Sequence, residues 1–378
     1  MVSAAQIRRE LRPHGITAPA CGSCYWFKDC GGYQAERSME TCFDATCCVF
    51  RGGNKSLCNS VCPYKADFSA WLSDTHGLSF DDLPSISQPT FELPHYVPVI
   101  DHASRRLDPL AWPVVALNMS SVLRIGRRPS SYYHAVGDSP VSIRQAFRIA
   151  ADSQVFLNGV GKDEYLERYW ENRLVSGAPG QLALLGLESA IGPNFSHFLG
   201  VPRTDNLYNR RRQLICLGEM QAAGVPVIPH LNAVMPEDWR FWSLFLTRNP
   251  EIRYVAVEFQ TGNRSPLQGR HAIDCLTRTQ AAINRPLHPI VVGGGQFVEY
   301  VATRFANFTL MDSMPFSKAM HRQYFELNAG RGSWKQGFKL IGQDVDDFLL
   351  ENVRNYSAFI KNRIDAAKSS PLKPSAVS

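Results

Sequence analysis

The sequence predicts an α/β fold: a closed (β/α)8 TIM barrel preceded by a small cysteine-rich metal-binding region. From about residue 112 to residue 342, short apolar runs that end in polar residues alternate with amphipathic stretches. Eight of the ten cysteines fall between residues 21 and 62, which sets that region apart. A chain of 378 residues has room for one barrel and one smaller region.

The predicted strands are the apolar runs. They cover residues 113–118, 154–158, 182–188, 225–230, 254–260, 288–293 and 307–312, and a weak run covers 338–342. In parallel barrels the chemistry lies at the carboxyl ends of the strands. The residues at or near these ends are therefore the candidate site residues: Asn118, Asn158, Glu188, His230, Glu258, Gln260, Gly293 and Asp312.

The domain boundaries follow from composition. Residues 1–111 are expected to form the cysteine-rich region and a connector that prolines interrupt, and residues 112–365 the barrel. Residues 366–378 are rich in serine, proline and lysine and are expected to form a disordered tail. No apolar stretch approaches the roughly 20 residues of a membrane span, and no signal-peptide core is present, so we expect a cytoplasmic protein without a membrane partner.

The formal net charge of +6 is compatible with a nucleic-acid partner but does not establish one. Arg124, Arg127 and Arg128 follow the first predicted strand, so a phosphate-contacting role at the barrel mouth is favoured for them. For Arg210 to Arg212 a solvated helix face is as well supported as a binding role.

The crowded cysteines favour metal ligation over disulfides in a cytosolic protein. Cys21 and Cys24 form a two-residue knuckle and Cys58 and Cys62 close the region, so these four are the main predicted ligands. Cys30 or Cys42 would belong to a second or shared site. Zinc is the preferred metal, an iron–sulfur cluster is the alternative, and a disulfide-rich secreted module is the competing interpretation.

The strand-end residues allow more than one role. Asp312 is suited to a nucleophile or a base, and equally to a helix N-cap. Glu188 is a general base or an ordinary ion-pair partner. Gln260 can read the edge of a planar heterocycle, and Gly293 to Gly295 let a ligand approach backbone amides. For His230 a buried structural role is favoured. No HxH or HExxH motif supports a metal inside the barrel.

The order of these segments resembles the tRNA-guanine transglycosylase superfamily, which includes archaeosine-type enzymes and DNA-modifying 7-deazaguanine relatives. Residues 113–118 are similar to its opening strand "PVFMPVGT", and residues 154–160 to "IILGNTYHL". Residues 185–189 occupy the place of "LTDSGGFQ", and residues 256–262 are similar to "FGIVQGG". The three glycines at 293–295, followed by residues 309–313, resemble "GAGHP…DLFDS".

The resemblance covers roughly residues 112–330 and implies a base-exchanging glycosyltransferase that inserts a 7-deazaguanine-type base into DNA or tRNA. It implies that Asp312 is the nucleophile, that Glu188 transfers protons, and that Gln260 holds the base. The other expected base-binding residues are Gly293, Gly294, Gly295, Asn118, Asn158, His230 and Glu258. A homodimer would be compatible with this assignment.

Three departures from the family pattern leave alternatives open. Glu188, followed by Ser-Ala-Ile, replaces the family's aspartate and its Ser-Gly-Gly-Phe; no cysteine after Cys275 supplies the family's C-terminal zinc motif; and the cysteine-rich region instead precedes the barrel. The first alternative is a barrel that binds or senses a 7-deazaguanine base without exchanging it. The second is an iron–sulfur barrel enzyme.

Overall fold

The structure is a computed structural model that describes residues 59–62, 65–82, 84–88, 92–125, 133–198, 201–328, 330–337 and 345–369. The chain divides into two compact units. The first comprises Met1–Ser85, Phe195–Cys216 and Asn232–Arg248, and the second comprises Ile86–Asn194, Leu217–Leu231 and Asn249–Ser378. Each unit is described by itself.

The second unit contains an eight-stranded, wholly parallel barrel. Its strands follow one another around the barrel in chain order: β1 (Tyr96–Ile100), β2 (Val114–Asn118), β5 (Gln154–Asn158), β6 (Ser189–Ile191), β7 (Val227–Ile228), β8 (Tyr254–Glu258), β9 (His288–Val292) and β10 (Thr309–Asp312). Between β7 and β8 the seam is reduced to one bridge, in which His230 lies opposite Ala256 and Leu231 N donates to Ala256 O at 2.8 Å. The barrel is therefore nearly closed, and the predicted fold class is confirmed.

The interior of the barrel is an apolar core to which every strand contributes. Val97, Ala116, Phe156, Ile228 and Met311 are among its members, and none of the five is measurably exposed. Successive side chains of a strand point to opposite faces, so residues two apart share a face. A polar residue two positions beyond a core residue therefore lies on the inner face, at the end of the barrel.

The segments that connect the barrel strands contain helices. Between β2 and β5 lie α5 (Met119–Val122), β3 (Leu123–Ile125), β4 (Tyr133–Ala135) and α6 (Pro140–Phe147); between β5 and β6 lie α7 (Asp163–Asn172) and α8 (Ala178–Ala183). Ser139 caps α6 by accepting from Ser142 N, and Pro140 opens its first turn. After β8 comes α11 (Pro266–Ala282), and after β9 come η4 (Gly295–Phe297) and α12 (Val298–Ala302).

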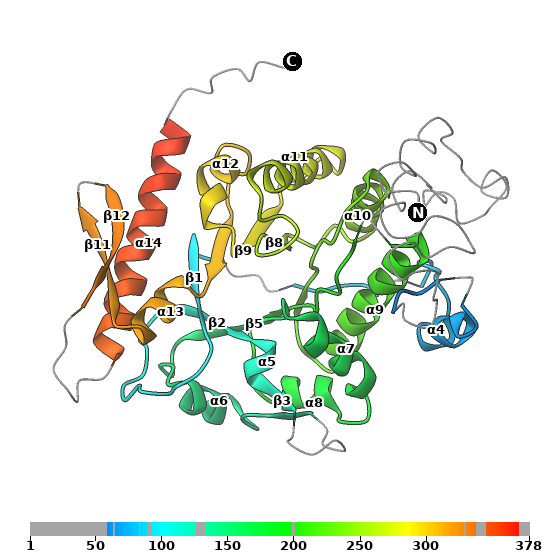
Figure 1. Cartoon of the computed structure of the whole chain (residues 1–378), viewed down its shortest axis with the longest axis horizontal. Coiled ribbons are helices and arrows are strands. Elements are labelled where there is room, and N and C mark those ends of the chain that lie inside the picture. The colour runs from blue at the N-terminus through cyan, green and yellow to red at the C-terminus, as the bar shows by residue number, and fades with distance from the viewer. Residues whose placement is uncertain are drawn as a thin grey trace, which may run out of the picture. The chain divides into compact units, whose positions relative to one another are not determined.

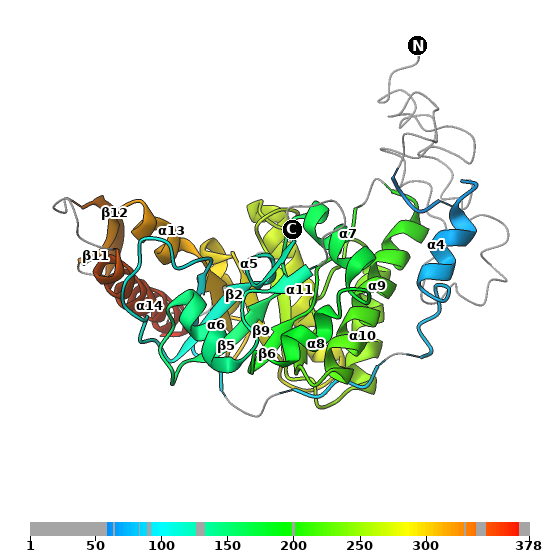
Figure 2. The same ribbon diagram turned by 90° about the horizontal axis from the view of Figure 1, so that it is seen from below.

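The chain after β10 builds an appendage of α13 (Met314–Met320), the hairpin β11 (Gln323–Asn328) and β12 (Arg331–Gln336), and α14 (Asp346–Ser369). Figure 1 shows α14, in red, running beside the orange hairpin, and Figure 2 shows the two side by side from below. Asn352 of α14 joins them: its Oδ1 accepts from Phe325 N at 2.7 Å and its Nδ2 donates to Gln323 O at 2.8 Å.

The described part of the first unit consists mainly of α4 (Phe68–Asp74), α10 (Pro236–Arg248) and the first part of α9 (Arg203–Ala222). Asp238 pairs with Arg210 and, at 2.6 Å, with Arg203. The guanidinium of Arg212 lies 4.2 Å from the ring centre of Phe195. The solvated-face interpretation of Arg210 to Arg212 is wrong, because all three are buried among carboxylates and aromatic rings.

Several predicted boundaries need correction. The first strand is β1, inside the stretch assigned to a connector, so the barrel begins before residue 112. The run at 182–188 is not a strand: α8 extends to Ala183 and β6 begins only at Ser189. The weak run at 338–342 lies outside the described residues, and β1 holds the eighth place in the barrel. Residues 366–369, assigned to a tail, belong to α14.

None of the described helices combines the length and the hydropathy that a bilayer crossing requires.

Candidate functional site

Polar side chains cap the apolar core at the carboxyl end of the barrel. Asp101, Asn118, Asn158 and Glu258 each lie two residues beyond a core residue, which places them on the inner face of β1, β2, β5 and β8. His230, beside Ala256, also faces inward and is 2% exposed. Four of these five residues were predicted from the sequence, and Asp101 was not.

Three of the five form a hydrogen-bonded relay. Val160 N donates to Asn158 Oδ1 at 3.2 Å, Asn158 Nδ2 donates to Asn118 Oδ1 at 2.8 Å, and Asn118 Nδ2 donates to Asp101 Oδ1. The backbone N–H of Val160 can only donate, so it fixes the orientation of both amides. The relay leaves one N–H of each asparagine and one carboxylate oxygen of Asp101 without a partner among the described residues.

Glu258 is committed to its own loop. Its Oε1 accepts from Gln260 N and from Thr261 N, both at 2.5 Å, and from Thr261 Oγ1 at 3.1 Å. The side chain is 7% exposed. These bonds hold the turn that follows β8. The carboxylate of Glu258 therefore has a structural role at the mouth and is not available to a ligand.

Asp312 faces away from the interior. Met311 belongs to the core, so the next side chain points outward, where it is enclosed by β1 and α14. Asp312 Oδ1 accepts from Met314 N at 3.0 Å and Tyr96 Oη at 3.3 Å, and Oδ2 accepts from Tyr356 Oη at 3.4 Å. Burial raises the pKa of Asp312 to about 6 and raises the pKa of both tyrosines.

Glu188 lies at the other end of the barrel. It precedes β6, and its N–H donates to Val155 O near the start of β5 at 2.9 Å. Because β5 and β6 are parallel, this is the amino-terminal end, whereas Asp312 ends β10. The prediction that Glu188 and Asp312 converge at one mouth is therefore wrong.

The predicted glycines and Gln260 lie in the loops that follow β9 and β8, respectively. A Cβ atom on Gly293, whose φ is +71°, would come within 2.3 Å of Gln260 Cγ, so the loops after β8 and β9 touch there. A Cβ atom on Gly295 would lie 3.2 Å from Tyr356 Oη and 3.8 Å from Asp312 Oδ2. Gly294 is buried between these two contacts. The structure thus brings Gln260 to Gly293, and Gly295 to Asp312.

Other predicted residues lie partly or wholly outside the described part. Arg124 is exposed on β3, with Nε donating to Ser121 O at 3.4 Å, while Arg127 and Arg128 are not described. Among the predicted metal ligands, Cys21, Cys24, Cys30, Cys42 and Cys58 are not described either. Cys62 is half-buried and in no disulfide. Within the described ranges, no group of three or more histidine, cysteine or acidic side chains could hold a metal.

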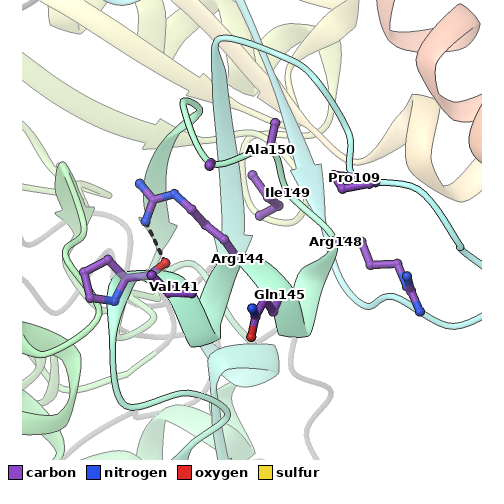
Figure 3. Close-up of a pocket in the computed structure, with 9 residues that line it drawn as sticks. Pro109, Val141, Arg144, Gln145, Arg148, Ile149 and Ala150 are labelled. Carbon is purple, nitrogen blue, oxygen red and sulfur yellow. Dashed lines mark hydrogen bonds between the residues drawn. The ribbon is translucent and has the colours of Figure 1, made fainter.

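A pocket of about 620 Å³ lies at the start of β5, beside α6 (Figure 3). Its arginines hold backbone carbonyls: Arg144 donates to Pro140 O at 2.9 Å and Ser153 O at 3.0 Å, and Arg148 donates to Leu107 O. Ser153 directly precedes β5, so this is the amino-terminal end of the barrel. That end contributes stability in such barrels, and we place the functional site at the opposite end.

No protein-family model matches this chain, and no curated protein sequence matches it significantly. The resemblance to the transglycosylase superfamily therefore remains a prediction from motifs, and the function is argued from the site.

Proposed function

We propose that this chain binds a planar heterocycle of the guanine or 7-deazaguanine type in the carboxyl-terminal mouth of its barrel. The relay from Val160 to Asp101 is the observation that carries the proposal. It offers a carboxylate acceptor next to amide N–H donors. A guanine-type edge presents adjacent N–H donors, which suit a carboxylate, beside a carbonyl oxygen, which suits an amide N–H.

Binding is favoured over base exchange by the positions of the two predicted catalytic carboxylates. Covalent exchange needs a nucleophile that reaches the sugar next to the bound base. Asp312 is enclosed by two tyrosines outside the inner face, and Glu188 lies at the far end of the barrel. Asp101 is the carboxylate that a ligand in the mouth would meet, and in this arrangement it contacts the N–H edge of the base, on the side away from the glycosidic bond, so it is not placed to attack the sugar as well.

The ligand experiment is calorimetric titration of the full chain with guanine, a 7-deazaguanine and adenine. Asp101→Asn replaces an acceptor with a donor opposite the ligand's N–H groups. Losing a hydrogen bond to a charged group costs about 1.5–3 kcal/mol, so guanine should bind roughly tenfold to a hundredfold more weakly. Glu188→Gln and Asp312→Asn are the matched controls and should bind as the wild type does. Equal affinity for adenine and guanine would contradict the proposal.

Exchange is tested separately by incorporation of labelled guanine into DNA and tRNA. If the wild type incorporates label, Asp101→Asn should reduce the activity because the base binds more weakly, and Asp312→Asn should retain it. Loss of exchange in Asp312→Asn alone would show that Asp312 is the nucleophile despite its outward orientation. Ligand binding without incorporation is the result expected of a sensing barrel.

We also propose that Cys21, Cys24, Cys58 and Cys62 bind zinc or an iron–sulfur cluster, on the strength of their spacing. Structural thiolate sites contribute folding energy directly, so Cys24→Ser or chelation should unfold the N-terminal region. Elemental analysis and the visible spectrum of the purified chain separate zinc from iron. Folded protein that contains neither metal would refute this assignment.

A further inference from the structure

A second concave site lies on the barrel's outer rim. A pocket of about 410 Å³ opens between α11 and α12, and Arg270, Gln296, Phe297 and Tyr300 are among its lining residues. Gln296 and Phe297 come from the loop after β9, and α11 follows the loop after β8. The pocket therefore shares the carboxyl-terminal end of the barrel with the mouth.

Two carboxylates in and near this pocket are already paired: Glu299, which lines it, and Asp274, which contacts the lining residue Tyr300 but does not line the pocket itself. Asp274 accepts from Tyr300 Oη at 2.9 and 2.8 Å and from Arg304 Nε at 2.9 Å. Glu299 forms a two-point pair with Arg363 at 2.5 and 2.6 Å. Because each carboxylate is paired with an arginine, it repels an incoming anion less than an unpaired carboxylate would. A ligand that displaces water from the pocket would also not leave either carboxylate without a partner.

Arg270 keeps its charge available. It is exposed, its guanidinium carbon lies 5.3 Å from the ring centre of Tyr300, and it forms no ion pair within the described ranges. By contrast, Arg304 stacks on the same tyrosine at 3.4 Å and is paired with Asp274. Arg264 is also exposed, and its carbonyl fixes Gln296 through a 2.6 Å hydrogen bond. Of the two charged side chains that line the pocket, Glu299 is paired with Arg363, and Arg270 forms no ion pair among the described residues.

We propose that this pocket binds a nucleotide of a single-stranded polynucleotide, with a phosphate at Arg270. A guanidinium pairs with phosphate through parallel N–H groups and stacks on bases. The volume falls within the range of small-ligand sites. The inference goes beyond the heterocycle site, because it assigns a polymeric partner to a different set of residues and does not require that the mouth be occupied.

The test is fluorescence anisotropy of a labelled single-stranded oligonucleotide, as DNA and as RNA, with the full chain over a range of salt concentrations. Arg270→Ala removes the exposed guanidinium. Arg278→Ala is the matched control: it removes an exposed arginine of the same helix that does not line the pocket and whose Nη2 donates to Cys275 Sγ at 2.9 Å. Circular dichroism confirms that both variants are folded.

The wild type should bind with an affinity that falls as salt rises. Arg270→Ala should bind several-fold more weakly and reduce the log–log salt slope by about 0.7, the value for one single-strand phosphate contact. Arg270→Lys should retain the slope and lose part of the affinity, because it keeps the charge without the planar stack. Salt-insensitive binding, no binding, or equal losses in Arg270→Ala and Arg278→Ala would overturn the proposal. A nucleoside monophosphate that binds as tightly as the oligonucleotide would replace it with a free-nucleotide site.

Discussion

Asp312→Asn should make the protein more stable near neutral pH. Asp312 is 8% exposed, and the two tyrosines and one backbone N–H that it meets only partly replace its hydration. Burial raises its pKa from 3.8 to about 6. Each pKa unit corresponds to 1.36 kcal/mol, so ionised Asp312 costs the folded state about 3 kcal/mol. Asparagine keeps the shape and the carbonyl acceptor without the charge.

The sign of the pH dependence follows from the raised pKa. Below about pH 3 both states hold the proton, so wild type and variant should have similar free energies of unfolding. As pH rises toward about 6, the unfolded wild type loses its proton before the folded one, and wild-type stability falls relative to the variant. Above the folded-state pKa the difference should level off at about 3 kcal/mol in favour of Asp312→Asn.

The measurement is urea unfolding followed by tryptophan fluorescence across this pH range. Asp152→Asn, which removes an exposed carboxylate in the turn before β5, is the matched control and should leave the stability profile nearly unchanged. A constant difference between wild type and Asp312→Asn at all pH values would refute the electrostatic argument. A variant less stable than the wild type near neutral pH would show that ionised Asp312 stabilises the fold.

Three further variants test the packing around the barrel. Arg106→Met removes one partner of the buried pair with Asp346, at 2.9 Å, and should lower the free energy of unfolding by about 3–5 kcal/mol in denaturant titration. Gly159→Ala would place a Cβ atom 2.2 Å from Ile191 O, so the backbone must shift; we expect a loss of about 1–3 kcal/mol and weakened ligand binding. His288, whose pKa burial lowers to about 4, contributes stability that is lost as pH falls from about 6.5 toward 4. His288→Gln should therefore reduce the loss of unfolding free energy between about pH 6.5 and 4 by about 3 kcal/mol. An unchanged loss would refute the role given to His288.

The sequence by itself determined the architecture, because the signals that define it are local. Apolar runs that end in polar residues located β2, β5, β8, β9 and β10 closely, and five such strands separated by helical patterns suffice to indicate a parallel barrel. It also located Asn118 and Asn158, since the last residue of a short buried run is fixed by the run itself. Their hydrogen bond at 2.8 Å follows from the pairing of β2 with β5.

Two strand assignments required the tertiary structure. In β1, Pro98 interrupts an apolar run that ends in Asp101, and proline ordinarily argues against a strand, so the relay's carboxylate went unpredicted. Around Glu188, good helix formers continue to Ala183 and Gly186 turns the chain at φ +60°, which shortens β6 to three residues. A short apolar run of this composition fits a helix end and a strand equally well.

Only the tertiary structure decided which way each strand-end side chain points. Strands of a parallel barrel are buried on both faces, by the interior on one side and by helices on the other, so their apolar runs carry no alternation that marks the inside. All four residues of β10 are buried, so the pattern of the sequence does not indicate whether Met311 or Asp312 faces the interior. In the closed barrel Met311 faces inward, and Asp312 faces outward between Tyr96 and Tyr356. Tyr356 lies 44 residues away in the sequence, on α14.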